Sequence, residues 1–243
     1  MSANEPLAIG VDIGGTGTKY GIVDRNGNVL FSSEMSTKKH KTIETFIDEL
    51  YDHLNELIEK AGGIGRMRGI GMGAPNGNFY SGTIEYAPNL PWRGIIPIAK
   101  MVSDKFKLDV TLTNDANAAA IGEMMYGAAK GMKDFIMITL GTGVGSGFVA
   151  NGQLIYGHDG FAGEIGHTIV IPDGRIHEGT NKKGSLESYA SATGVRLTAL
   201  EVLENSKEPS LLRSLNKDEI DSKAVYDAAI KGDKLALEIF EFT

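Results

Sequence analysis

Two segments rich in glycine and threonine are the parts of this sequence best suited to holding an anion. Asp12–Lys19 reads Asp-Ile-Gly-Gly-Thr-Gly-Thr-Lys, and Gly141–Gly147 reads Gly-Thr-Gly-Val-Gly-Ser-Gly. Backbone N–H groups in such turns form an anion-binding concavity, threonine hydroxyls add donors, and Lys19 adds positive charge. Together these groups suit a polyphosphate, and tight β-turns that bind no ligand are the alternative.

Two familiar phosphate motifs do not fit these segments. A Walker A loop needs a Gly-Lys pair followed by Ser or Thr, and the sequence contains no Gly-Lys pair. A dinucleotide-binding fingerprint needs a helix after its glycines, whereas strand-like residues follow here. Ser146 also occupies the place of that fingerprint's last glycine, counted from Gly141.

Asp115 follows a predicted strand and precedes an alanine-rich helical segment. Side chains at the carboxyl end of a strand project into the crevice where α/β proteins hold ligands. A carboxylate there could accept the proton of an attacking hydroxyl. Taken alone, the pattern favours a simpler role, in which Asp115 caps the helix.

A glycine-rich loop carries Glu164 and His167, three residues apart. A carboxylate and an imidazole in such a loop suit hydrogen bonding to vicinal hydroxyl groups. The alternatives are a metal site, for which two ligands without cysteines are weak support, and a surface loop with one satisfied histidine. His158 and His177 receive no role from their sequence context.

The hydrophobic pattern predicts the elements that must position these residues. Predicted strands are 7–13, 19–24, 29–33, 69–73, 110–113, 135–140 and 153–156. Predicted helices are 42–61, 95–106, 116–129, 185–203 and two within 222–242. The pairs Asn26-Gly27 and Asn151-Gly152 predict type I′ hairpins.

The order strand, Gly/Thr turn, strand, Asn-Gly turn, strand occurs twice in the chain. We interpret this as an internal duplication that gives two related α/β lobes facing each other across a cleft, with chance recurrence of hairpins as the alternative. The predicted lobes are 1–115, with the first glycine turn, and 116–243, with the second turn and the Glu164–His167 loop.

The overall composition argues against several classes of partner. Its 243 residues include 24 basic and 31 acidic side chains, a net charge of −7, which gives no broad surface for nucleic acid or anionic membrane. There is no cysteine, so disulfides and thiolate metal sites are excluded. No secretory signal or membrane-length apolar run is evident, and we expect a cytoplasmic protein.

The segments together resemble the ROK family of sugar kinases and sugar-responsive repressors. Family members have the actin-like, hexokinase-type fold of two ribonuclease-H-like lobes, and the likeness runs from about Leu7 to the end of the chain. The matching motifs are Asp12–Thr16 with Lys19, Asn114–Ala118, Leu140–Gly145, Gly163–His167 and Leu186-Glu187.

The resemblance implies an ATP-dependent hexose kinase. Glucose is the first expectation for the sugar, with N-acetylated aminosugars, mannose and fructose open. Asp115 would take the proton of the sugar 6-hydroxyl, and Asp12 would position Mg²⁺ through water. The expected sugar-binding residues are Asn89, Asn114, Asp115, Glu164, His167 and Glu187. The expected phosphate-binding residues are Asp12, Gly14, Gly15, Thr16, Thr18, Lys19, Gly141, Thr142 and Gly143. We also expect a homodimer.

One departure from the family concerns a structural zinc ion. Many members carry a Cys-x-Cys-Gly-x-x-Gly-Cys run before the Leu-Glu pair. Here Glu178, Thr180 and Ser185 take the cysteine places, and Asn181 takes the place of a glycine. We therefore expect no structural zinc and a metal-free His167. The loop 174–184 must hold itself together by hydrogen bonds or be mobile.

The second departure is length, because family members run further than Thr243 through a segment that lines the adenine pocket. We expect the second lobe to be incomplete and assign no adenine-binding residue. Two other functions stay open. A sugar-sensing repressor would need a helix-turn-helix domain, for which the first strand near residue 7 leaves no room, and an inactive sugar-binding module would fit the short C-terminus.

Overall fold

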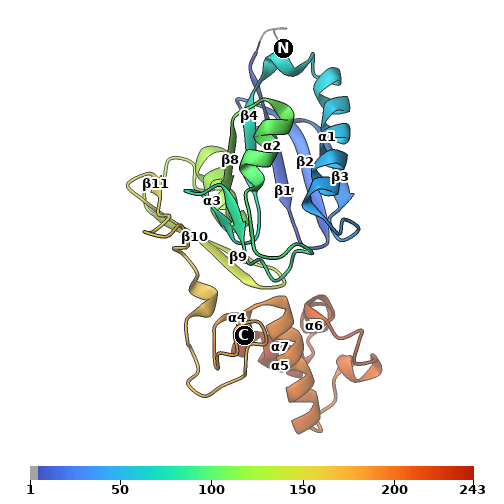
Figure 1. The fold of residues 1–243 in the computed structure, drawn as a ribbon. Helices are drawn as coiled ribbons and strands as arrows, with labels where there is room; N and C mark the ends of the chain where they lie inside the picture. The colour runs from blue at the N-terminus through green and yellow to red at the C-terminus, as the bar shows by residue number, and fades with distance from the viewer. Residues whose placement is uncertain (1–4) are drawn as a thin grey trace. The chain divides into compact units, whose positions relative to one another are not determined.

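A computed structural model describes residues 5–243, which form two compact units. The first comprises residues up to Met137 together with Gly147–Gly163, and the second comprises Ile138–Ser146 together with Glu164–Thr243. The first unit contains a five-stranded sheet with helices on it, and the second is mostly helical (Figure 1). The predicted lobe boundary at residue 115 stays a prediction, because compact units need not coincide with the halves of a duplicated fold.

The sheet of the first unit has the strand order β3-β2-β1-β4-β8. Its strands are β1 (Leu7–Ile13), β2 (Gly17–Asp24), β3 (Val29–Ser36), β4 (Met67–Gly73) and β8 (Val110–Thr113). β1, β2 and β3 pair antiparallel, whereas β1, β4 and β8 run parallel. The carboxyl ends of the three parallel strands therefore meet at one edge of the sheet.

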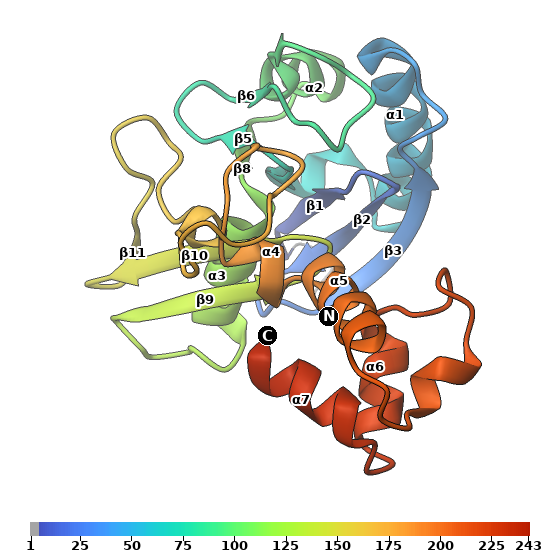
Figure 2. The same cartoon turned by 90° about the horizontal axis from the view of Figure 1, so that it is seen from below.

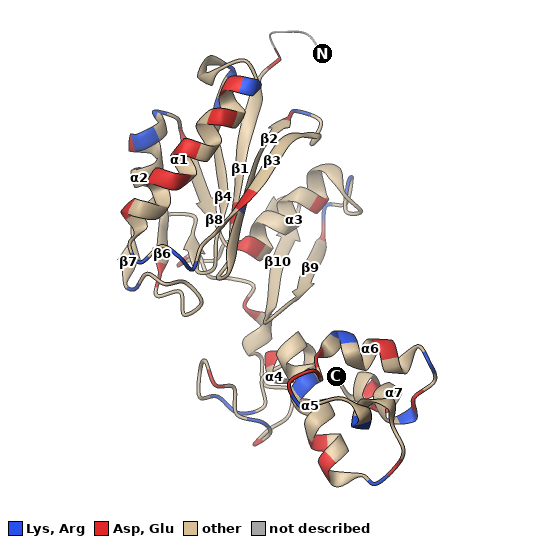
Figure 3. Ribbon diagram, turned by 90° about the vertical axis from the view of Figure 1, so that its right-hand side faces the viewer, with Lys and Arg blue, Asp and Glu red and all other residues tan. Residues whose placement is uncertain are grey.

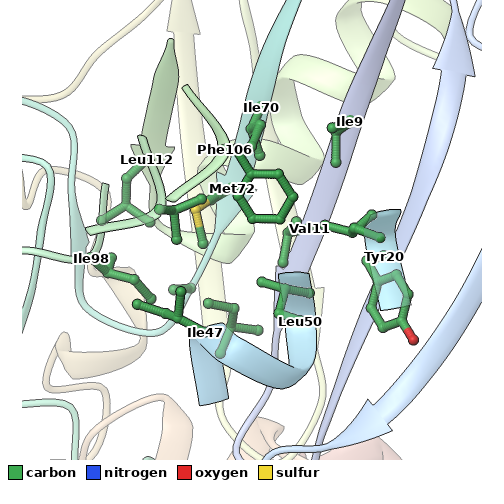
Figure 4. Close-up of a cluster of buried hydrophobic side chains, with 14 of the residues drawn as sticks. Ile9, Val11, Tyr20, Ile47, Leu50, Ile70, Met72, Ile98, Phe106 and Leu112 are labelled. Atoms are coloured by element: carbon green, nitrogen blue, oxygen red, sulfur yellow. The ribbon is translucent and has the colours of Figure 1, made fainter. Parts of the chain in front are cut away.

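Two helices cover one face of this sheet, α1 (Ile43–Lys60) and α2 (Ile98–Phe106), and α3 (Asp115–Tyr126) lies on the other (Figure 3). Side chains on β1 alternate between the faces, as strand geometry requires. Its buried residues are Leu7, Ile9, Val11 and Ile13. Figure 4 shows Ile9 and Val11 meeting Ile47 and Leu50 of α1 and side chains from β4, β8 and α2 in one core.

Helix α1 agrees with its predicted range and its predicted cap. The Thr42 hydroxyl accepts the N–H of Thr45 at 3.4 Å, and Gly62 and Gly63 with φ of 99° and 93° follow the helix end. The predicted helix 95–106 is wrong at its start, because α2 begins only at Ile98. Ile95–Ile96 form strand β7, which fits the extended backbone that a following proline, Pro97, imposes.

Strand β7 belongs to a small sheet that the sequence does not predict. It pairs in the order β5-β6-β7 with β5 (Gly77–Asn78) and β6 (Thr83–Glu85). These strands are only two or three residues long, too short for an alternating pattern to show.

The two predicted Asn-Gly hairpin turns differ in the structure. Asn151 and Gly152 have φ of 52° and 73°, so the type I′ turn between β10 (Val144–Ala150) and β11 (Gln153–Leu154) is confirmed. At Asn26-Gly27 the prediction of a type I′ turn is wrong, since only Gly27 has positive φ. The Asp24 carboxylate accepts the N–H groups of Asn26 and Asn28 at 2.8 and 2.9 Å and stabilises a different loop.

A three-stranded sheet of order β11-β10-β9 completes the repeated pattern, with β9 spanning Phe135–Leu140. In both β1–β3 and β9–β11 successive strands are neighbours, as the repeated order predicts. Whether this repetition reflects duplication of a whole lobe stays a prediction.

The second unit packs three helices together, α5 (Ala192–Asn205), α6 (Ser222–Ala229) and α7 (Lys234–Phe242) (Figure 2). The predicted pair of helices around Gly232-Asp233 is confirmed, with Asp233 capping α7. The predicted helix 185–203 is divided at Ser191 into α4 (Glu187–Ala190) and α5, because the Ser191 hydroxyl caps α5. Among the described residues, no helix has the length and apolar character needed to cross a membrane.

The packing of α1 gives a test of the first unit. Leu50 is fully buried, so Leu50→Ala should lower the free energy of unfolding by about 2–5 kcal/mol, through lost burial and the cavity that remains. Val29→Ala is the control. Val29 is 62% exposed, so this substitution should change the free energy of unfolding by less than about 0.5 kcal/mol. Urea unfolding of both variants measures the difference, and equal losses would contradict this core assignment.

Candidate active site

One group of predicted site residues lies within the first unit, on the face of the sheet opposite the α1 core. Asp12 is exposed there, between the buried residues Val11 and Ile13 of β1. It pairs in register with Lys19 of β2 and Gly73 of β4. Directly opposite residues on neighbouring strands share a face, so the ammonium group of Lys19 lies on the same face of the sheet as Asp12.

Asp115 is placed by the start of α3. Asn114, rather than Asp115, caps this helix, since its Oδ1 accepts the N–H groups of Ala116 and Asn117 at 2.8 and 3.4 Å. The alternative that Asp115 is the cap is therefore wrong. Asp115 is the first helical residue, with an exposed side chain at the positive end of the helix dipole.

Gly73 lets the first turn of α3 lie against β4. A Cβ atom on Gly73 would meet Asp115 Cα at 3.5 Å and Ala118 Cβ at 3.3 Å. Because Gly73 pairs with both Asp12 and Thr113, the close approach brings the two carboxylates to one edge of the sheet.

The surroundings of Asp12 raise the pKa of its carboxyl group. Partial burial raises the pKa of Asp12 above its ordinary value, and the negative charge of Asp115 raises it further. Lys19 acts in the opposite direction and lowers the pKa of Asp12. The site thus holds two negative charges close together with one partly compensating cation, an arrangement that favours a bound divalent metal ion.

The first glycine turn is closed by a hydrogen bond from the N–H of Gly14 to the carbonyl of Gly17, at 3.0 Å. Gly15 lies against Asn89, whose carbonyl oxygen would be 2.6 Å from a Cβ atom at Gly15. Thr16 is exposed at the tip of the turn. The turn therefore presents backbone to solvent and brings the predicted sugar contact Asn89 beside it.

Thr18 does not fit its predicted contact with phosphate. It is fully buried, and its hydroxyl lies 2.8 Å from the hydroxyl of Thr37. The alternation of β2 explains this difference, because Thr18 and Lys19 must face opposite sides of the sheet. Lys19 faces solvent, and Thr18 supports the turn from within.

The second glycine turn belongs to the second unit. The N–H of Gly141 donates to the carbonyl of Gly143 at 2.9 Å, and the N–H of Ala192 donates to the carbonyl of Gly141 at 2.9 Å. The Thr193 hydroxyl donates to the carbonyl of Thr142 at 3.2 Å. These bonds hold the turn on the first residues of α5, while Gly141 and Thr142 stay exposed.

The predicted sugar-binding residues of this unit gather near that turn. Glu187 Oε2 accepts the N–H of Val144 at 2.7 Å, and a Cβ atom at Gly143 would collide with the Glu187 carboxylate. His167 Nε2 lies 4.0 Å from Glu164 Oε2, and both side chains are about half exposed. His167, Glu164 and Glu187 can thus offer donors and acceptors beside the second turn.

His177 is a site residue that the sequence analysis missed. Its Nε2 lies 2.6 Å from Glu187 Oε1, and its ring centroid is 5.9 Å from that of His167. The ligand atoms of His167, His177 and Glu187 all lie within 4.8 Å of one another, so these three residues could together hold a metal ion. The sequence gives no signal for this grouping, because His177 has no regular spacing to the other two.

The residues at the zinc-ligand positions do not fit a thiolate zinc site. The Ser185 and Ser188 hydroxyls are buried and 2.8 Å apart, and the Thr180 hydroxyl lies 3.0 Å from His177 Nδ1. The N–H of His177 donates to the carbonyl of Lys182 at 2.8 Å. The expectation that the loop 174–184 is held by hydrogen bonds is confirmed.

Arg175 anchors the loop to the helices of the second unit. Its guanidinium donates to the carbonyls of Ser188 and Gly194 and to the hydroxyl of Thr198, and it pairs with Glu201 at 2.7 Å. Arg175 also lies over the Tyr189 ring, 4.8 Å from its centroid.

Comparison with known proteins supports the motif-based interpretation. The ROK family model matches residues 8–243. Glucokinase of Halalkalibacterium halodurans is 38% identical over 236 residues, which are 96% of this chain and 71% of that protein. The xylose repressor of Caldicellulosiruptor bescii is 31% identical and covers 93% of this chain, which in turn spans 57% of the repressor.

A solved structure shows the same fold. The ROK family glucokinase from Streptomyces griseus, crystallised with glucose and AMPPNP, superposes with a TM-score of 0.77 at 36% identity, over 96% of this chain and 74% of that one. The α/β architecture is accordingly that of the actin-like ATPase fold, as predicted. Because the family model matches nearly the whole chain, we conclude that this protein belongs to the ROK family.

Proposed function

We propose that this protein is a hexose kinase that transfers a phosphoryl group from ATP to the 6-hydroxyl of glucose. The observation that carries the proposal is the meeting of Asp12 and Asp115 at the edge formed by β1, β4 and β8. Similarity to glucokinases, one of them solved with glucose and AMPPNP, supports the choice of sugar and donor. Mannose, fructose and N-acetylated aminosugars are the alternatives that a substrate assay separates.

Asp115 is the proposed general base. Its exposed carboxylate at the first turn of α3 can be reached by a sugar hydroxyl, and it can accept the proton as that oxygen attacks the γ-phosphate. Asn114 uses its carbonyl oxygen to cap the helix, which leaves its amide NH₂ as a donor for a sugar oxygen.

Asp12 fits the proposed role of holding Mg²⁺ through water. Magnesium prefers oxygen ligands and keeps several of its waters, and it neutralises charge on the phosphates when bound. Asp12 supplies a carboxylate next to the first glycine turn. Its pKa is raised by partial burial and then by the negative charge of Asp115, and a cation would offset that charge. Lys19 offers a fixed positive charge on the same face.

The remaining contacts are proposed from the motifs that resemble those of the ROK family. The phosphates would lie against the exposed residues Thr16, Gly141 and Thr142 and the half-buried glycines Gly14, Gly15 and Gly143. The sugar would contact Asn89, Asn114, Glu164, His167 and Glu187. Homodimer formation, a cytoplasmic location and the lack of nucleic-acid binding stay predictions.

One alternative function remains because the chain is also similar to a xylose repressor. In that alternative the chain binds a sugar without phosphorylating it. Measurement of ADP release with ATP, Mg²⁺ and a panel of hexoses decides between them. Sugar-dependent ADP release supports a kinase. Sugar binding without turnover would support the sugar-binding module.

Asp115→Asn tests the proposed base. The substitution removes the proton acceptor and keeps the size of the side chain, so kcat should fall by about 10²–10⁴-fold. Sugar affinity, measured by titration calorimetry without ATP, should change far less. Retention of wild-type turnover by this variant would rule out Asp115 as the base.

Asp12→Asn tests the electrostatics of the site through stability. The folded state raises the pKa of Asp12, so ionisation of this group destabilises the fold as pH rises through that pKa. The neutral variant should therefore have a Tm higher by ~1–2 °C at pH 7.5, a small shift because solvent screens the group. The gain should shrink toward pH 4, because Asp12 of the folded wild type then binds a proton and is neutral, as the asparagine of the variant is at every pH.

Asp104→Asn is the matched control for this measurement. A hydrogen bond from Lys100 lowers the pKa of Asp104, so removal of its charge should not raise the Tm. A lower Tm of Asp12→Asn at pH 7.5 would contradict the prediction. It would mean that the attraction between Asp12 and Lys19 outweighs the repulsion between Asp12 and Asp115.

A further inference from the structure

We propose that His177 is a positioning residue that fixes the carboxylate of Glu187 for sugar binding, in a loop that closes without metal. The inference rests on the proposed function, since Glu187 is a proposed sugar contact. It assigns a role to a histidine that no sequence motif identifies.

Both oxygens of the Glu187 carboxylate have partners in the second unit. Oε1 lies 2.6 Å from His177 Nε2, and Oε2 accepts the N–H of Val144 at 2.7 Å. The two side chains are only 20% and 18% exposed, so solvent screens their interaction less than that of a surface pair. Each carboxylate oxygen has two lone pairs, so a sugar hydroxyl can still donate to it.

The His177 ring is itself held on its other side. Its Nδ1 lies 3.0 Å from the hydroxyl of Thr180, which stands at one of the positions where other family members have a cysteine. The backbone N–H of Asn181 donates to the carbonyl of His177 at 2.8 Å. With both ring nitrogens engaged, the imidazole has a defined orientation toward Glu187.

The space around Glu187 leaves its carboxylate little freedom to turn elsewhere. A Cβ atom at Gly143 would collide with Glu187 Oε2, and one at Gly166 would be 3.5 Å from Glu187 Cβ. The side chain thus passes between the second glycine turn and the turn that carries His167. Loss of the His177 bond releases Oε1, while Oε2 keeps the N–H of Val144.

A metal ion shared by His167, His177 and Glu187 is the competing arrangement. Two ligands of a tetrahedral zinc ion lie roughly 3.3 Å apart, given metal–ligand distances of about 2.0–2.2 Å. The distance of 2.6 Å between His177 Nε2 and Glu187 Oε1 is shorter than that and is a hydrogen-bond length. The geometry therefore favours a direct pair over a bridging ion.

Substitutions at position 177 test the proposal. His177→Ala should raise the KM for the sugar and the calorimetric Kd by about tenfold, with KM for ATP changed less than about twofold. His177→Gln should recover part of the loss, because its amide NH₂ can still donate to Glu187. The control is His158→Ala, which removes a histidine that is 99% exposed and should behave as wild type.

Metal analysis and a zinc-selective chelator separate the two arrangements. The proposal expects no stoichiometric zinc in the purified protein and an unchanged sugar Kd after chelation. It is overturned by stoichiometric zinc whose removal weakens sugar binding, or by His177→Ala with sugar KM and Kd within twofold of wild type.

A separate experiment tests the contact between His177 and Glu187 even if the proposed kinase function is wrong. If wild-type protein binds no hexose, histidine ¹⁵N NMR still tests the pair, since Glu187→Gln should shift the ring resonances of His177. An unchanged His177 spectrum in that variant would overturn the positioning role whatever the substrate.

Discussion

The hydrogen-bond register of three parallel strands fixes where the chemistry of the first unit can occur. Gly73 of β4 pairs with Asp12 on one side and with Thr113 on the other, so the carboxyl ends of β1 and β8 cannot slide apart without breaking the ladder. A shift of one residue would also turn Asp12 into the core and bring Val11 or Ile13 to solvent. The apolar packing against α1 thus determines the position of a charged side chain on the opposite face.

The same register imposes an electrostatic cost. Asp12 and Asp115 repel each other at the sheet edge, and Lys19 offsets only part of the effect on the pKa of Asp12. Such strain is typical of functional sites, because a group that is unfavourable in the empty protein interacts strongly with a cation or a phosphate-bound metal ion. The core of α1, α2 and β1 supplies the stability that makes this arrangement tolerable.

Helices and strands whose apolar residues follow a regular spacing over many residues were predictable from the sequence. The buried face of α1, from Phe46 to Ile58, and the alternation of β1 each reflect one local pattern that tertiary packing reinforces. The wrong predictions of the Asn26-Gly27 turn and of the α3 cap come from hydrogen bonds that side chains make to nearby backbone. The Asp24 carboxylate accepts two backbone N–H groups around Asn26-Gly27, which prevents the type I′ turn. Asn114, rather than Asp115, accepts the backbone N–H groups at the start of α3. Competition between side chains for the same backbone donors does not show in periodicity.

The placement of some site residues follows from a local sequence pattern, and that of others depends on tertiary contacts. The exposed positions of Asp12 and Lys19 were predictable because they follow from strand alternation, whereas the roles of these residues and of the glycine turns stay predictions. Thr18 was misassigned because its motif was considered without the alternation that buries it. His177 was missed because its partner, Glu187, becomes a neighbour only when the loop 174–184 folds back through Arg175 and the backbone bonds of Lys182 and Gly184.

Glu187 links the second glycine turn to the loop that carries His177 through one carboxylate. One oxygen takes the N–H of Val144, the residue after the second glycine turn, and the other faces His177. The absence of a side chain at Gly143 makes this contact possible, so the glycine serves the carboxylate as well as any phosphate. A sugar that orders Glu187 must therefore also restrain the start of β10 and the turn before it. By reciprocity, a phosphate that fixes the turn would favour the orientation of Glu187 that the sugar requires. If the turn binds phosphate and Glu187 binds the sugar, as proposed, the hydrogen bond between them couples the two ligands without any large movement of the chain.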